Sequence, residues 1–136
     1  MVLKMEVLSV KRGDITYQLC KRLVRSLMDV FILDELRDRP LSGYDITLLI
    51  RENFNFLISP GSVYSVLYSL EREGLIRGFP RGRKRIYRLT SKGERALHTV
   101  LNMNRRILHL ISRILPEEDS EDLNTKFAYE TFKEDS

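Results

Sequence analysis

The chain has 136 residues, of which 43% are apolar and 31% are charged, and its net charge is +4. This length allows one compact domain with an appendage and excludes two full domains, while the composition is that of a soluble globular protein. The single cysteine excludes an intramolecular disulfide bond. Because the sequence has no signal peptide and no apolar run of about eighteen residues, we expect a cytoplasmic protein outside the membrane.

The modest net charge conceals a strong asymmetry along the chain. Residues 72–95 include nine basic and two acidic residues, a net charge of +7. Residues 116–136 include two basic and eight acidic residues, a net charge of −6. The basic segment favours a polyanionic partner such as nucleic acid.

The first 37 residues predict a short arm followed by a helix. Apolar and charged residues alternate from Leu3 to Val7, so residues 1–14 are open to a short strand, a partly ordered arm or a basic arm that touches DNA. Within Ile15–Arg37, Ser26 with Asp29 three residues later resembles a capping box, so both one helix and two helices fit this segment. Its broad apolar face comprises Leu19, Leu23, Leu27, Val30, Phe31 and Ile32.

A further helix is predicted from Ser42 to about Asn53, with Asp45 in the capping position three residues after Ser42. The next residues, to Leu57, form a turn into the following helix. The side chains expected in the core are Ile46, Leu49 and Ile50 from the helix and Phe54, Phe56 and Leu57 from the turn.

The segment Ile58–Gly93 combines a helix with a hairpin. Ser59 is suited to cap the helix and Pro60 to occupy its first position, while Gly74 stops it in the left-handed conformation. The predicted core face of this helix consists of Val63, Val66, Leu67 and Leu70.

Two short strands, Leu75–Phe79 and Arg85–Leu89, follow this helix, and Pro80 and Gly82 break the chain between them. A helix followed by a two-stranded wing is the order of a winged helix-turn-helix. The fold class predicted is therefore mainly α with a small two-stranded β-wing, in a winged helix-turn-helix that is followed by a C-terminal dimerisation helix.

The helix and the wing also carry the candidate DNA-binding residues. Hydroxyl and phenol groups can bond phosphate oxygens or base edges, and an all-basic cluster suits the phosphate backbone. The alternative is an exposed polar face without a ligand. The candidates are Ser59, Ser62, Tyr64, Ser65 and Tyr68 on the helix, and Arg81, Arg83, Lys84 and Arg85 on the wing.

The last long helix, capped by Thr90, carries apolar residues at alternating steps of four and three, the spacing of a coiled-coil seam. Such a stripe favours dimerisation, and the alternative is that the helix folds back on its own domain. Pro116 ends the helix, and the acidic tail is open to a short helix or disorder. The predicted dimerisation residues are Leu97, Leu101, Asn104, Leu108, Ile111 and Leu115.

Four motifs occur in order: LSGYDI at 41–46, ISPGSVY at 58–64, LEREGLI at 70–76 and YRLTSKG at 87–93. With them the chain resembles the PadR family of transcriptional regulators. The resemblance implies a winged-helix DNA-binding domain, a helical dimerisation region, and repression that is often relieved by a small-molecule effector. The resemblance spans roughly residues 27–97, and the whole sequence predicts an N-terminal arm or short strand (1–14), a winged-helix DNA-binding domain (15–90) and a helical dimerisation region with an acidic tail (91–136).

The interpretation favoured is a homodimeric regulator that binds double-stranded DNA at a palindromic operator. The alternative is a winged helix used for protein contacts in a larger assembly, because the helix from Pro60 to Leu70 holds no Lys or Arg. We expect no enzymatic activity, no cofactor and no metal, since the sequence shows no Gly-rich phosphate loop, Cys/His cluster or paired carboxylates. His98 and His109 lie eleven residues apart on one helix, too far to share a metal ion.

Overall fold

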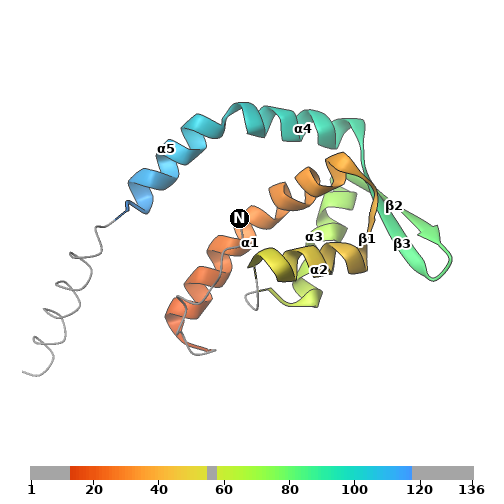
Figure 1. Cartoon of the computed structure of the whole chain (residues 1–136), viewed down its shortest axis with the longest axis horizontal. Coiled ribbons are helices and arrows are strands. Elements are labelled where there is room, and N and C mark those ends of the chain that lie inside the picture. Colours follow the sequence, from red (N-terminus) through yellow and green to blue (C-terminus); the bar gives the residue numbers. More distant parts are fainter. Residues whose placement is uncertain (1–12, 55–57, 118–136) are drawn as a thin grey trace, which may run out of the picture. The chain divides into compact units, whose positions relative to one another are not determined.

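The structure, a computed structural model, describes residues 13–54 and 58–117. The chain divides into two compact units, residues 1–99 and 100–136. The first unit contains α1 (Ile15–Asp38), β1 (Leu41–Ser42), α2 (Gly43–Phe54), α3 (Pro60–Arg72), β2 (Ile76–Arg81), β3 (Lys84–Leu89) and most of α4 (Ser91–Asn102). The second contains α5 (Asn104–Ile114). The mainly helical fold with a small β-wing is confirmed (Figure 1).

Helices α1, α2 and α3 enclose one hydrophobic core together with the sheet. Each helix contributes residues spaced three or four apart, which lie on one helical face. The largest fully buried side chains include Met28 and Ile32 of α1, Ile46 and Ile50 of α2, Val63 and Leu67 of α3, and Ile76 of β2. All four residues predicted for the core face of α3 are buried, which confirms that prediction.

Helix α1 is a single helix, so the two-helix alternative is excluded. The Ser26 hydroxyl donates to the Leu23 carbonyl oxygen at 2.6 Å inside the helix and does not cap a new one. The predicted apolar face is only partly right, because Leu19, Leu23 and Leu27 are about half exposed. The buried residues of α1, which apart from Ile32 lie outside the predicted face, are Met28, Ile32, Leu33 and Leu36.

Helix α2 begins with the predicted capping box. The Ser42 backbone N–H donates to Asp45 Oδ2 at 3.2 Å, and the Asp45 backbone N–H donates to Ser42 Oγ at 3.0 Å. Hydrogen bonds to the Asp45 carboxyl from the Ser42 side chain and from the Ser42 backbone N–H lower the pKa of this carboxyl. The reciprocal pair satisfies donors that the first turn of a helix leaves free.

The sheet has three antiparallel strands in the order β1-β3-β2. Strand β1, with Leu41 opposite Tyr87, is a third strand beyond the two predicted. The expected break at Pro80 is wrong, because Pro80 lies within β2 opposite Arg85. Strand β2 lies at the sheet edge, where a residue without an N–H is tolerated. Gly82, with a φ of 63°, makes the tight turn of the hairpin.

Helix α3 is bounded by the predicted residues. Ser59 Oγ accepts from the Ser62 backbone N–H at 3.2 Å, and Pro60 occupies the first position. At the other end Gly74 has a φ of 77°. The Leu75 N–H donates to the Leu70 carbonyl oxygen at 2.9 Å and the Gly74 N–H to that of Glu71 at 3.0 Å, which is a Schellman motif.

The start of α4 is bonded to the end of α3. Thr90 caps α4 as predicted, since its Oγ1 accepts from the Gly93 N–H at 3.0 Å. The Thr90 hydroxyl also donates to the Gly74 carbonyl oxygen at 2.6 Å, and Lys92 Nζ donates to that of Glu73 at 2.8 Å. A Cβ on Gly93 would lie 2.0 Å from the Leu75 carbonyl oxygen, so only glycine allows this close approach.

The single long helix predicted after Thr90 is interrupted at Met103, which separates α4 from α5. The Met103 N–H donates to the Val100 carbonyl oxygen three residues earlier, and the φ and ψ of Met103, −91° and 7°, depart from helical values.

No described helix is both long and apolar enough to span a membrane. The predictions for residues 1–12, Phe56, Leu57 and the chain after residue 117 lie outside the described residues.

Candidate nucleic-acid interface

The exposed face of α3 carries most of the predicted helix residues. Tyr64 and Tyr68 are 49% and 67% exposed, and Ser65 is exposed between them. Ser59 and Ser62 differ from these residues, because their hydroxyl groups share a hydrogen bond of 3.0 Å while Ser59 caps the helix. Ser65, Tyr64 and Tyr68 therefore form the polar surface of α3 that is open to a ligand.

The position of Tyr64 is set by the start of α2. A Cβ on Gly43 would lie 2.8 Å from Tyr64 Cε1, so the ring packs directly against the backbone of this glycine. Because one side of the ring contacts Gly43 while half of the residue remains exposed, α2 fixes the direction in which the phenol group extends.

Sequence reasoning missed Arg72 as a candidate. Helix α3 continues to Arg72, two residues beyond the predicted Leu70. Its guanidinium carbon lies 5.7 Å from the centre of the Tyr68 ring, one helical turn earlier. The four-residue spacing of Tyr68 and Arg72 was the signal that could have found it. The exposed face of α3 therefore includes one cation.

The tip of the wing is entirely basic. Arg81 and Lys84 lie opposite each other where the strands end, and Arg83 lies in the turn between them. All three are exposed. Nearer the base, the guanidinium groups of Arg77 and Arg88 lie 5.1 and 6.0 Å from the centre of the Phe79 ring. The hairpin projects from the helical core of its unit (Figure 1), so this charge lies at a protruding edge.

Arg85 differs from the residues at the tip. Its Nη2 donates to Glu71 Oε1 of α3 at 2.6 Å, and its guanidinium carbon lies 5.8 Å from the centre of the Tyr87 ring. The structure therefore brings together Arg81, Arg83 and Lys84, which form no salt bridge with any residue that it describes, but binds Arg85 to a carboxylate of the same chain. That contact joins residues fourteen apart in sequence, and local sequence patterns do not reveal it.

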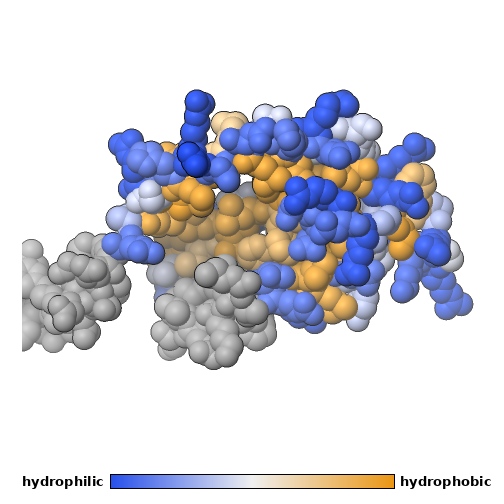
Figure 2. Space-filling view, turned by 45° about the horizontal axis from the view of Figure 1, so that its top comes forward, coloured by the Kyte–Doolittle hydropathy of each residue, from blue (hydrophilic) through white to orange (hydrophobic). Residues whose placement is uncertain are grey.

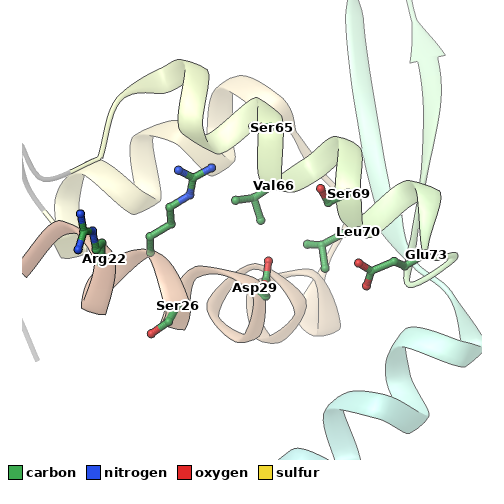
Figure 3. Close-up of a pocket in the computed structure, with 9 residues that line it drawn as sticks. Arg22, Ser26, Asp29, Ser65, Val66, Ser69, Leu70 and Glu73 are labelled. Carbon is green, nitrogen blue, oxygen red and sulfur yellow. The ribbon is translucent and has the colours of Figure 1, made fainter. Parts of the chain in front are cut away.

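A groove of about 450 Å³ lies between α1 and α3, beside Ser65 and Ser69. Figure 3 shows Arg22 at one end and Glu73 at the other. Partial burial of the Asp29 carboxyl in the groove removes water that would stabilise its charged form, which raises its pKa. The negative charge of Glu73 raises this pKa further. The groove thus has charges of both signs, unlike the tip of the wing.

The predicted dimerisation residues fall into two groups. Leu97 is 1% exposed and packs in the core of its own unit, so it is unavailable to a partner and its assignment to the seam is wrong. The spacing of Leu97 matches that of the seam, but Leu97 lies on the part of α4 that packs against the winged-helix core. The remaining residues are exposed: Leu101, Asn104, Leu108, Ile111 and Leu115. Exposed apolar residues appear as orange areas of the surface in Figure 2.

These features agree with comparisons with known proteins. The model of the transcriptional regulator PadR-like family matches residues 32–99, which is half of the chain. A curated relative from Streptomyces fradiae, described as an uncharacterised 37.1 kDa protein in transposon TN4556, is 34% identical over 83 residues. That match covers 57% of this chain, which spans only about a quarter (24%) of the relative's length.

Solved structures show the same fold. A PadR-like transcriptional regulator from Bacillus cereus is 25% identical, with a TM-score of 0.59 and coverage of 71% of this chain and 99% of that chain. A PadR-family regulator from Eggerthella lenta is 23% identical, with a TM-score of 0.61 and coverage of 77% and 96%. The family match confirms the resemblance seen in the four motifs. The chain belongs to the PadR-like family of transcriptional regulators, which are non-enzymatic DNA-binding proteins.

Proposed function

We propose that this regulator represses transcription by binding double-stranded DNA sequence-specifically as a homodimer. The observation that carries the proposal is the pairing of an exposed helix face bearing Ser65, Tyr68 and Arg72 with a wing tip whose three charged residues are all cations. Hydroxyl, phenol and guanidinium groups suit base edges and phosphates, and unpaired cations suit the backbone.

In the proposed complex α3 lies in the major groove and the wing follows the neighbouring backbone or minor groove. Tyr64, held against Gly43, and Ser65 extend from the first half of α3, where winged helices contact base edges. Arg81, Arg83 and Lys84 bind phosphates. Ser59 and Ser62 act chiefly by holding the start of the helix, because each already bonds the other.

The homodimer is supported by α5, of which no residue is buried in the protomer. Its apolar residues Leu108 and Ile111 lie three residues apart on one face, and Leu115 follows directly after the helix at the next step of four, whereas Arg105, Arg106 and His109 lie on the other face. A helix of this kind needs an apolar partner surface, and a second copy offers the same stripe. Asn104 adds the one polar position in the proposed seam, where an amide fixes register.

Two-fold symmetry would make the operator palindromic, with half-sites about one or two helical turns apart. Occupation of such an operator by the dimer is the proposed means of repression. A small-molecule effector that relieves repression is the mode of regulation that the family resemblance implies.

The rival function, a winged helix used only for protein contacts, rested on the absence of Lys and Arg from Pro60–Leu70. Arg72 on the same helix weakens that argument. Salt elution from a column of nonspecific duplex DNA distinguishes the two functions. A DNA-binding protein is retained and elutes at a strongly salt-dependent point, whereas passage through the column at low salt would contradict the proposal.

A further inference from the structure

The last turn of α3 is fastened to both strands of the wing through one carboxylate oxygen. Glu71 Oε1 accepts from the Gly78 backbone N–H of β2 at 3.0 Å and from Arg85 Nη2 of β3 at 2.6 Å. A charged acceptor strengthens both bonds relative to neutral pairs. Helix α3 and the hairpin are therefore linked directly by two contacts in addition to the chain that joins them.

Arg85 reaches Glu71 by crossing β2 at Gly78. A Cβ on Gly78 would lie 2.4 Å from Arg85 Nε and 2.8 Å from its Cζ, so the path exists only because residue 78 has no side chain. Two residues further along β3, Tyr87 is buried in the core, and the centre of its ring lies 5.8 Å from the Arg85 guanidinium carbon. The Arg85 side chain thus contacts the strand and the helix on one side, while half of it remains exposed.

Electrostatics alone gives Glu71 no favourable role in DNA binding. A carboxylate next to a phosphate-binding surface repels DNA, and it also neutralises Arg85, which would otherwise be a further free cation of the wing. A benefit from Glu71 must come from the geometry that it imposes on the wing.

We propose that Glu71, with Arg85 and Gly78, positions the wing at the angle to α3 that lets both elements contact one duplex. Glu71 and Arg85 are positioning residues, and Arg85 is not a phosphate ligand. The inference rests on the proposed DNA-binding function and assigns to this cluster the alignment of its two contact surfaces.

Charge repulsion and positioning predict opposite signs when Glu71 is neutralised. We expect Glu71→Gln to bind a labelled duplex, chosen from genomic fragments that the wild type retains, about tenfold more weakly, because the amide oxygen can still accept both bonds but lacks the charge that strengthens them. Glu73→Gln is the matched control, because Glu73 lies two residues away, is exposed and loses the same charge. It should bind as tightly as the wild type or slightly tighter. Equal or tighter binding by Glu71→Gln would overturn the inference.

Gly78→Ala tests the geometry without changing any charge. The new methyl group displaces Arg85, so we expect weaker DNA binding with an unchanged net charge. In an Arg85→Ala background the same substitution should have little further effect, since Arg85 supplies the three nearest atoms that the methyl group would meet. Wild-type affinity of Gly78→Ala, or full additivity of the two substitutions, would contradict the proposed cluster.

The wild-type titration separates failure of this inference from failure of the proposed function. If the wild type shows no salt-dependent DNA binding, the proposed function fails and the inference falls with it. If the wild type binds and the Glu71 and Gly78 variants bind equally well, only the inference fails. Thermal melting of each variant identifies unfolding, and Gly78→Ala, which keeps both charged groups, decides the result if Glu71→Gln does not fold.

Discussion

Helices α3 and α5 carry apolar residues at the same three- and four-residue spacing, but their surroundings are opposite. On α3 the four residues of this stripe are all buried by α1, α2 and the sheet. On α5 no residue is buried, and Leu108 is 63% exposed. Helical periodicity therefore predicts that an apolar face exists, but it does not tell whether the same chain or a second copy covers it.

The largest effect on stability is expected from truncating a buried side chain of α3. Leu67 is fully buried, so Leu67→Ala should reduce the free energy of unfolding by about 2–5 kcal/mol. Urea unfolding at two protein concentrations measures the loss, which should not depend on concentration because the contact lies within one protomer. A loss below about 1 kcal/mol would show that Leu67 is not a core residue.

On the α5 side, Leu108→Glu should dissociate the proposed dimer at micromolar concentration, because each protomer would bury an unpaired carboxylate. Secondary structure should remain, since this residue contributes nothing to the winged-helix core. Sedimentation velocity is the measurement, and Asn104→Leu is the control, which should stay associated. If the Leu108→Glu variant still sediments as a dimer, the interface does not involve α5. The next candidate is then the exposed apolar stripe of α1, which consists of Ile15, Leu19, Leu23 and Leu27.

A smaller effect is expected from the wing. Arg81→Ala combined with Arg83→Ala should weaken binding to all duplexes about equally. The slope of log affinity against log salt should become shallower by roughly one to two units, since each phosphate contact contributes about 0.9. Arg105→Ala with Arg106→Ala removes the same charge from the polar face of α5 and should leave the slope unchanged. Equal slopes in both double variants would contradict a phosphate-binding wing.

The smallest effect concerns Asp29 in the groove beside α3. Its pKa is raised in the folded state by shielding and by Glu73, so the folded protein binds this proton more tightly than the unfolded chain. The resulting loss of stability grows as the pH rises from the unfolded pKa through the raised folded value. We expect Asp29→Asn to increase the free energy of unfolding at pH 7 by less than about 0.5 kcal/mol, seen as a slightly higher melting temperature, and to have no such effect near pH 3. A gain that persists at pH 3 would contradict this cause.

Features of the fold with local causes were predictable from the sequence. Ser59, Pro60 and Gly74 bound α3, and Ser42 with Asp45 starts α2, because each acts on backbone groups within a few residues. Strand β1 was missed because two residues carry no periodicity. Continuation through Pro80 depends on β2 being an edge strand, which is a property of the sheet.

The candidate site was predictable where it depends on composition and not where it depends on distant contacts. The basic tip of the wing follows directly from residues 81–84. The pairing of Arg85 with Glu71 and the burial of Leu97 depend on elements that meet only in the folded unit. Arg72 was missed because α3 was predicted to end two residues too early, at Leu70, although Gly74 was already recognised as the residue that stops this helix.

The central claim is that two copies of α3 and its wing read a symmetric DNA sequence while α5 joins the copies. Sequencing the genomic fragments that the wild-type protein retains at moderate salt tests it most directly. The account predicts enrichment of an inverted repeat with half-sites about one or two helical turns apart. Retained fragments that share no sequence, or that share only a single unrepeated half-site, would contradict it.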